Sequence, residues 1–359
     1  MHKKEQKLDI FLLVTAVLLT IFGLLAIYNA SVVIAERDFA DTYHYIRDQA
    51  MWAAVGLVLL FVVSRIDYHI WQKLALPLLL ATVVLLLAVF IPGAGIKTLG
   101  AARWVNFGFF IVQPAEAAKL ALVIYLASWF SAKEKGRFFA FILLVGVLIG
   151  LVLAQPDMGT SVVLGSSAVV LYFLSGAPLS QFLLLIPASV ALFIALITIA
   201  PYRLNRVLTL FDPQHDPLGA SYHVQQALLA LGSGGLTGVG FGKSLQKYAY
   251  LPESTTDSIF AIVAEEFGFI GATLIICAFL FLILRGFMIA RRAQDTFGKL
   301  LGFGLTSFLA IQIIINLGAQ VALLPFTGIP LPFISYGGSS LIISMVSVGI
   351  LLNISKRGR

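Results

Sequence analysis

Long apolar runs dominate the chain, and short polar segments separate them. A run of about 20 apolar residues is long enough to cross the hydrocarbon core of a bilayer as a helix. The pattern therefore predicts an all-α polytopic membrane protein with ten transmembrane helices. The predicted spans are residues 9–31, 49–65, 72–91, 114–131, 138–155, 159–176, 180–200, 258–284, 299–324 and 333–354.

The basic residues predict how these spans are oriented. Cytoplasmic loops of membrane proteins are enriched in Lys and Arg. An even number of spans puts both termini on one side. Placing that side in the cytoplasm puts most of the 24 Lys and Arg residues in inner segments. We therefore expect both termini to be cytoplasmic, and the long loop at 201–257, between the seventh and eighth spans, to be extracytoplasmic.

Composition narrows the class of protein. Hydrophobic residues make up 60% of the 359 residues and charged residues only 11%, a balance that soluble domains do not show. Lys and Arg in cytoplasmic loops explain the net charge of +7, so this charge does not indicate nucleic-acid binding. The single cysteine, Cys277, excludes an internal disulfide, and the sequence has no Cys/His cluster for a structural metal.

The loop at 201–257 is long enough to suggest a function of its own. Its pattern predicts a helix at 222–231, followed by a glycine-rich stretch at 232–242. Gly-Lys-Ser follows, as in a phosphate loop, but the Walker A motif needs a glycine at position 237, which is Thr237. We interpret the glycines as tight turns that pack the loop onto the membrane surface.

Charged side chains within the spans indicate structural or functional sites. Placing each one in the bilayer costs about 2.5–3.5 kcal/mol unless it is paired or hydrated. Glu116 and Lys119 are spaced i, i+3 and share one helix face. They form either a structural ion pair or a pair that presents a cation to a ligand phosphate. Asp157 lies between two spans, where capping the next helix is its simplest role.

Two other polar patterns occur in the later spans. Glu265 and Glu266 lie two turns into the eighth span, so at least one of them is expected to face the protein interior. Gln312, Asn316 and Gln320 are spaced by four and form one polar stripe. We interpret this stripe as a set of polar side chains that hold neighbouring helices together.

Many of the polar groups are expected at one depth, in the outer half of the bilayer or at its outer rim. The inner halves of the spans are almost entirely apolar, whereas a transporter of a polar solute should line both halves with polar groups. We therefore predict a site open to the outer face and the outer leaflet. Its expected members are Arg103, Glu116, Lys119, Gln155, Asp157, Asp257, Glu265, Tyr336 and Ser339.

Two carboxylates beside a proline, Glu253 and Asp257, stand where the long loop meets the eighth span. A general base needs a carboxylate within hydrogen-bond reach of a hydroxyl, with a pKa raised toward neutrality by burial. Either residue fits that role. The alternative for Asp257 is an N-cap of the eighth span, because it directly precedes Ser258.

Several motifs combine these residues in a fixed order along nearly the whole chain. The motifs are Arg103-Trp-Val-Asn-Phe-Gly108, Gln113-Pro-Ala-Glu116 with Lys119, Gln155-Pro-Asp-Met-Gly-Thr160, Gly232-Ser-Gly-Gly235, Leu251-Pro-Glu253, Thr256-Asp257, Ala264-Glu-Glu266, Thr327-Gly-Ile-Pro-Leu-Pro-Phe333 and Ser335-Tyr-Gly-Gly-Ser-Ser340. In this set the chain resembles the SEDS family (shape, elongation, division and sporulation) of polytopic peptidoglycan glycosyltransferases.

The resemblance implies one membrane domain over residues 1–359 that polymerises lipid II at the outer face of the bacterial cytoplasmic membrane. The essential aspartate of the family matches Asp257. This residue would deprotonate the acceptor sugar hydroxyl for attack on a polyprenyl-pyrophosphate-linked donor. A single-displacement, inverting route needs only one such carboxylate. Arg103 and Lys119 would hold the pyrophosphate, with Glu116 positioning Lys119.

The resemblance also implies partners: a class B penicillin-binding protein with transpeptidase activity, and proteins of the divisome or elongasome. No cofactor is assigned, and a divalent cation at the substrate pyrophosphate stays open. Two departures from the family pattern stand beside Asp257, where Thr255 replaces the usual His and Ser258 the usual Phe. Subtype-specific residues favour the division type slightly over the elongation type. A lipid II flippase and a non-catalytic scaffold for a transpeptidase remain alternative functions.

Overall fold

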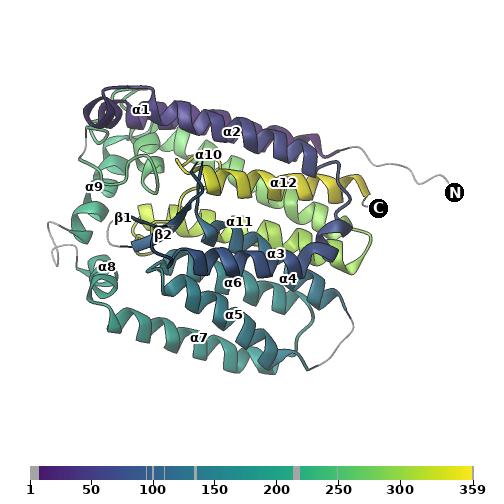
Figure 1. Cartoon of the computed structure of the whole chain (residues 1–359). Helices are drawn as coiled ribbons and strands as arrows, with labels where there is room; N and C mark the ends of the chain where they lie inside the picture. The colour runs from purple at the N-terminus through teal and green to yellow at the C-terminus, as the bar shows by residue number, and fades with distance from the viewer. Residues whose placement is uncertain are drawn as a thin grey trace.

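The fold is a bundle of long helices that run roughly side by side, with both chain termini at one end (Figure 1). The computed structural model describes residues 8–93, 95–98, 101–108, 110–132, 136–212, 219–248 and 250–357. The bundle helices are α1 (Ile10–Phe39), α2 (His44–Val63), α3 (His69–Ala88), α4 (Pro114–Ser131), α5 (Phe138–Leu153), α6 (Met158–Leu174), α7 (Leu179–Ile199), α10 (Ile259–Arg292), α11 (Thr296–Gln320) and α12 (Gly338–Arg357).

Each of the ten predicted spans overlaps one of these helices, and the all-α polytopic fold is confirmed. Among the described residues, seven helices are long and apolar enough to cross a membrane, and α5 and α6 are shorter apolar helices. Helix α4 has 18 residues and includes the charged pair Glu116 and Lys119. The number of ten spans stays a prediction.

Several predicted boundaries are wrong; α10, for example, continues to Arg292, eight residues past the predicted end at 284. Helix α1 continues to Phe39, eight residues past the predicted end, and stops where Ala40 adopts a left-handed conformation with φ 51°. Helix α12 begins at Gly338 rather than at residue 333. The residues before it turn sharply, with φ 67° at Phe333, so they cannot continue a helix.

The helices differ greatly in burial, which locates the core. In the most apolar stretches of α11 and α12, 78% and 72% of residues are buried inside the protein. The corresponding value for α7 is 6%, and α7 lies at the edge of the bundle (Figure 1). Helix α11 packs on α4, α6 and α10, so it forms the centre of the bundle. Apolar residues cover α7 all round, as expected for a helix that faces lipid.

The long loop contains two short helices at the end of the bundle opposite the termini (Figure 1). The helix predicted at 222–231 is present as α9 (Ala220–Ser233). Helix α8 (Pro201–Phe211) was not predicted; it begins at a proline, which suits a first helical position. Residues 213–218 and 249 of the predicted loop lie outside the described residues.

The glycine-rich stretch packs against a break in α10 rather than lying free on a surface. The main-chain nitrogens of Val239 and Gly240 donate to the carbonyls of Glu265 and Glu266 at 3.0 and 3.1 Å. A Cβ atom on Gly238 would lie 2.0 Å from the Glu266 carbonyl oxygen. Helix α10 is interrupted at Gly268, where φ is 66°. The glycines therefore permit a close contact between two backbones.

A small antiparallel sheet between α3 and α4 was not predicted. Its strands are β1 (Gly95–Thr98), β2 (Ala101–Asn106) and β3 (Ile111–Val112), in the order β1-β2-β3. It lies at the same end of the bundle as α8 and α9 (Figure 1). The sheet positions Arg103, one of the predicted site residues.

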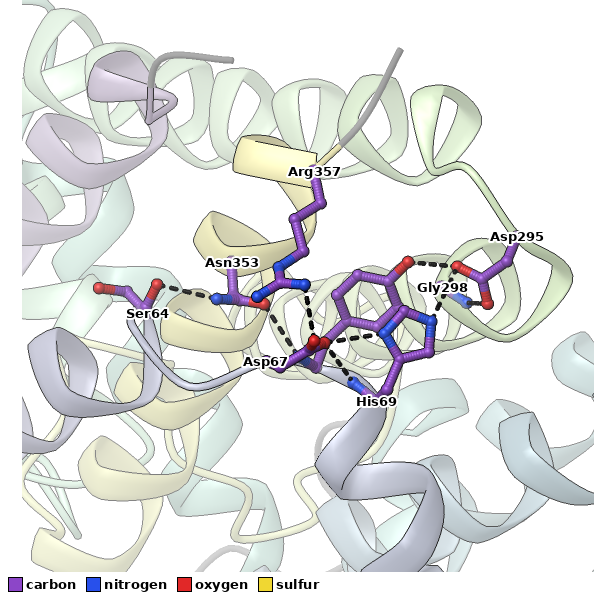
Figure 2. A network of polar contacts seen from close by, with 8 residues as sticks. Ser64, Asp67, His69, Asp295, Gly298, Asn353 and Arg357 are labelled. Carbon is purple, nitrogen blue, oxygen red and sulfur yellow. Dashed lines mark hydrogen bonds and ion pairs between the residues drawn. The ribbon is translucent and has the colours of Figure 1, made fainter. Parts of the chain in front are cut away.

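A polar network holds the opposite end together (Figure 2). The Asn353 side-chain oxygen accepts from the Tyr68 nitrogen at 2.9 Å, and Arg357 pairs with Asp67 at 2.6 Å. The Tyr68 hydroxyl donates to Asp295, which also caps α11. These contacts join the turn between α2 and α3 to α12 and to the turn between α10 and α11.

Candidate active site

Asp257 lies at the end of the long loop, immediately before α10. The N-cap of α10 is Ser258, and the Asp257 carboxylate accepts a hydrogen bond from the Thr256 hydroxyl at 3.3 Å. The alternative that Asp257 caps the helix is therefore wrong. The residue is only 7% exposed, so its carboxylate is held in a site with little water.

Burial raises the pKa of Asp257, and the negative charge of Glu253 raises it further, to about 7. The positive charge of Arg206 partly offsets these effects. A carboxylate with a pKa near 7 can both accept and release a proton at physiological pH. Asp257 therefore has the chemical property that a general base requires.

The polar stripe of α11 holds the backbone around Asp257. Asn316 donates to the main-chain oxygens of Asp257 and Ile329 at 3.0 and 2.8 Å. Gln320 donates to Asn316 at 2.8 Å and accepts from the Ala261 nitrogen at 2.7 Å. The stripe holds segments together through hydrogen bonds, as predicted, but it joins α11 to loop segments and to the start of α10.

The segment before α12 contacts the other side of the Asp257 loop. The Tyr336 nitrogen donates to the Thr255 oxygen at 2.9 Å, and the Ser335 hydroxyl donates to the Thr256 oxygen. The Tyr336 hydroxyl donates to Asp48 at 2.7 Å, and burial together with this carboxylate raises the pKa of Tyr336. The Tyr336 backbone thus contacts the Asp257 loop at Thr255, while its side chain contacts Asp48.

Glu116 and Lys119 form a buried ion pair of 2.8 Å. Lys119 also donates to the Gln312 side chain at 2.7 Å, and both charged residues are only 2% exposed. Of the two alternatives open from the sequence, the geometry favours the structural ion pair. Lys119 is enclosed by its partners and has little surface left to meet a ligand.

Arg103 also forms hydrogen bonds within the chain. Its guanidinium donates to the main-chain oxygens of Gln155 and Pro156 at 3.3 and 2.5 Å. The Gln155 side chain donates to the Leu86 oxygen at 3.0 Å, while its own side-chain oxygen is buried without a partner. Arg103 therefore anchors the sheet to the turn between α5 and α6.

Asp157 caps α6, as its sequence position suggested. Its carboxylate accepts from the Thr160 nitrogen at 2.9 Å and from the Gln113 side chain at 3.3 Å. The Gln113 nitrogen in turn donates to the Ser339 hydroxyl at 3.1 Å. Asp157 and Ser339 thus meet through Gln113, at the start of α4.

Glu265 belongs to a different cluster. It accepts from the Ser244 hydroxyl and from the Leu245 nitrogen, the latter at 3.1 Å. Its neighbour Glu266 accepts from Asn29 at 2.5 Å and lies 3.9 Å from the Lys247 ammonium. Both oxygens of Glu265 are occupied, so the geometry favours a role in anchoring the glycine-rich stretch over one in binding a ligand.

Sequence reasoning missed a pocket of about 320 Å³ beside the Asp257 loop. Helices α8 and α9 supply most of its lining, including Arg206 and His223, and Pro252 and Phe326 close it. Arg203 and Arg206, spaced by three among apolar residues, were the available signal, because this spacing is typical of an amphipathic helix. In the described ranges no group of three or more His, Cys, Asp or Glu side chains gathers.

A family model for the FtsW, RodA and SpoVE cell cycle proteins matches residues 9–359. This chain belongs to that family. It is similar to a probable peptidoglycan glycosyltransferase FtsW of Geobacter metallireducens, with 40% identity covering 99% of the chain and 96% of the relative. It is 39% identical to the stage V sporulation protein E of Bacillus subtilis, with each chain fully covered. The chain is therefore a bacterial integral membrane protein.

Solved structures of the family share the fold. A chain in a peptidoglycan synthase complex, solved to show how polymerisation and crosslinking are coordinated, superposes with a TM-score of 0.79 and 27% identity, covering 97% of each chain. RodA of Thermus thermophilus superposes with a TM-score of 0.72 and 29% identity, covering 98% of each chain.

Proposed function

We propose that this protein is a peptidoglycan glycosyltransferase that polymerises lipid II, with Asp257 as the general base. The observation that carries the proposal is the buried Asp257 carboxylate, whose pKa lies at about 7 beside Glu253. Family membership and the similarity to proteins named peptidoglycan glycosyltransferase support it. Glu116, by contrast, is paired with the cation Lys119 at 2.8 Å.

In the proposed reaction the Asp257 carboxylate accepts the proton of an acceptor sugar hydroxyl. The hydroxyl oxygen then forms a bond to the anomeric carbon of the donor sugar, and the bond from that carbon to the pyrophosphate oxygen breaks. The polyprenyl pyrophosphate leaves with the bonding electron pair. Because the acceptor itself is the nucleophile, one carboxylate suffices and the anomeric configuration inverts.

The remaining residues of the predicted substrate site take different parts in this proposal. Glu253 keeps the pKa of Asp257 high, and its side chain accepts from the Thr256 hydroxyl at 2.8 Å. We assign Tyr336 and Ser339 to the wall of the substrate site on the α12 side, because Tyr336 contacts the Asp257 loop and Ser339 contacts Gln113 at the start of α4. The buried contacts of Glu116, Lys119, Arg103, Gln155 and Asp157 support a role in holding that wall in shape.

We further propose that both termini are cytoplasmic and that α8, α9 and the sheet lie at the outer face, within one membrane domain. There Asp257 would meet lipid II in the outer leaflet. A class B penicillin-binding protein is the proposed transpeptidase partner, because a relative of this fold is known from a peptidoglycan synthase complex. Divisome or elongasome proteins would complete the assembly.

The test is polymerisation of lipid II by the purified protein with its partner, comparing wild type with Asp257→Ala. We expect glycan polymer from the wild type and none from the variant, with unchanged thermal unfolding. Lipid II crossing liposome membranes without polymer would support a flippase instead. Cell growth that is unaffected by Asp257→Ala would support a scaffold.

A further inference from the structure

The pocket beside the Asp257 loop is built from parts of the chain that are far apart in sequence. Arg206 lies on α8, His223 on α9 and Phe326 in the segment before α12. Pro252, five residues before Asp257, forms part of the wall. The pocket therefore adjoins the segment that positions the proposed base.

Arg206 is the charged residue of this pocket. One nitrogen of its guanidinium donates to the Phe326 oxygen at 2.9 Å, which fixes the side chain against the wall. No carboxylate in the described part of the chain forms an ion pair with it, and the residue is exposed. A guanidinium held at one edge, with its other N–H groups open, suits a phosphate or pyrophosphate ligand.

The basic groups predicted to hold the pyrophosphate are already occupied. Lys119 is buried between Glu116 and Gln312, and Arg103 donates to two main-chain oxygens. Either would have to break these contacts to reach a ligand. Arg206 needs no such rearrangement, because the pocket in front of it is already open.

His223 shapes the pocket without adding charge. Burial lowers the pKa of His223 to about 4, and the positive charge of Arg206 contributes, so the ring is neutral at physiological pH. The ring stacks on Phe326 with 3.9 Å between centroids, and Nε2 lies 2.6 Å from the Ser258 hydroxyl. His223 thus connects the pocket to Ser258, which directly follows Asp257 and departs from the usual family residue.

We infer that this pocket binds the pyrophosphate of the lipid-linked substrate, with Arg206 as the cation that holds it. The inference rests on the proposed function, and assigns the pyrophosphate to Arg206 in place of Arg103 and Lys119. When the bond to the anomeric carbon breaks, the leaving pyrophosphate gains negative charge, which a positioned guanidinium stabilises. Asn205, also in the lining, is a polar neighbour for the same group.

The test is binding of farnesyl diphosphate to the purified full-length protein in phosphatidylcholine nanodiscs, measured by native mass spectrometry. Arg206→Gln is compared with Arg203→Gln, which removes the same charge from the same helix. Arg203 is a matched control because its guanidinium donates to the Tyr202 hydroxyl at 2.9 Å and to the Leu196 oxygen at 3.1 Å. Thermal unfolding of each variant checks that it is folded, and Arg206→Lys restores the charge.

We expect Arg206→Gln to weaken binding about tenfold or more, the usual effect of losing a charge-assisted hydrogen bond. Arg203→Gln should change it less than twofold, and Arg206→Lys should recover part of the loss. Equal losses in the Gln variants, or no loss in Arg206→Gln, would overturn the inference. The inference would also be overturned if Arg206→Gln no longer weakened farnesyl diphosphate binding once phosphatidylglycerol is added. The pocket would then bind bilayer headgroups.

The binding measurement involves no turnover, so its outcome is separate from that of the proposed function. Failure of the wild type to polymerise lipid II would contradict the proposed reaction and leave the Arg206 result standing.

Discussion

Asn316 on α11 donates a hydrogen bond of 3.0 Å to the main-chain oxygen of Asp257. The same amide donates to the Ile329 oxygen at 2.8 Å, so one buried side chain joins the Asp257 loop to the segment before α12. Among the described side chains, the Thr256 hydroxyl is the one that donates to the Asp257 carboxylate, at 3.3 Å. Its backbone is thus held firmly while its reactive oxygens stay available.

Asn316→Leu should leave two buried carbonyl oxygens without a donor. Each such loss costs about 1–3 kcal/mol, and the Asp257 backbone would be free to shift. We expect a lower thermal unfolding temperature and a lower kcat for lipid II polymerisation, with KM nearly unchanged. A control is Thr198→Leu on α7, whose exposed hydroxyl donates only to carbonyls of its own helix and whose loss should leave the unfolding temperature close to that of wild type. A variant with full kcat would show that this hydrogen bond does not position the base.

Glu253→Gln should move the pH dependence of polymerisation toward lower pH. The negative charge of Glu253 favours the protonated form of Asp257 and raises its pKa, so removing that charge lowers the pKa. Asp257 would then be ionised, and active as a base, at a lower pH than in wild type. The rate is measured across about two pH units on either side of 7. An unchanged midpoint, or a shift to higher pH, would contradict the coupling of the two carboxylates.

Lys119→Met should destabilise the protein strongly, because it leaves the Glu116 carboxylate buried without its cation. Removing one partner of a buried ion pair typically costs about 3–5 kcal/mol. The double variant with Glu116→Gln should be markedly more stable than Lys119→Met alone. Thermal unfolding in detergent distinguishes these outcomes, and additive losses would argue that the pair is not coupled.

Gly238→Ala should disrupt the contact between the glycine-rich stretch and α10. The new Cβ would meet the Glu266 carbonyl at 2.0 Å, and φ at this residue is +82°. We expect a loss of about 2 kcal/mol or more in unfolding free energy. Gly232→Ala is the control, since a Cβ there meets nothing within 4 Å and the residue lies in α9. Equal stability of the two variants would mean that the close backbone contact contributes little.

Local spacing predicted the features that depend on one element alone. The length of the apolar runs located the helices because a bilayer demands that length, and spacing of three or four placed Glu116 by Lys119 and aligned Asn316 with Gln320. Spacing also suggested Asp157 as a cap, which the structure confirms.

Features that depend on contacts between distant segments were not predictable in this way. Their similar predicted depth in the bilayer grouped Glu265 with Asp257. Depth alone does not show which neighbouring segment a helix face contacts, and Glu265 contacts Ser244 instead. The Arg206 pocket needs α8, α9 and Phe326 to converge, and the Arg206–Phe326 contact spans 120 residues. The family resemblance supplied the role of Asp257, while burial and the charge of Glu253 supply its physical reason.

The most direct measurement is the rate of lipid II polymerisation by the purified protein with its partner, from about pH 5 to 9, for wild type and Asp257→Asn. Since the base must be ionised to work, we expect the wild-type rate to rise with pH through about 7, the pKa of Asp257. Asp257→Asn keeps the shape of the side chain and should form no polymer at any pH. Polymerisation by Asp257→Asn at the wild-type rate would contradict the assignment of Asp257 as the base.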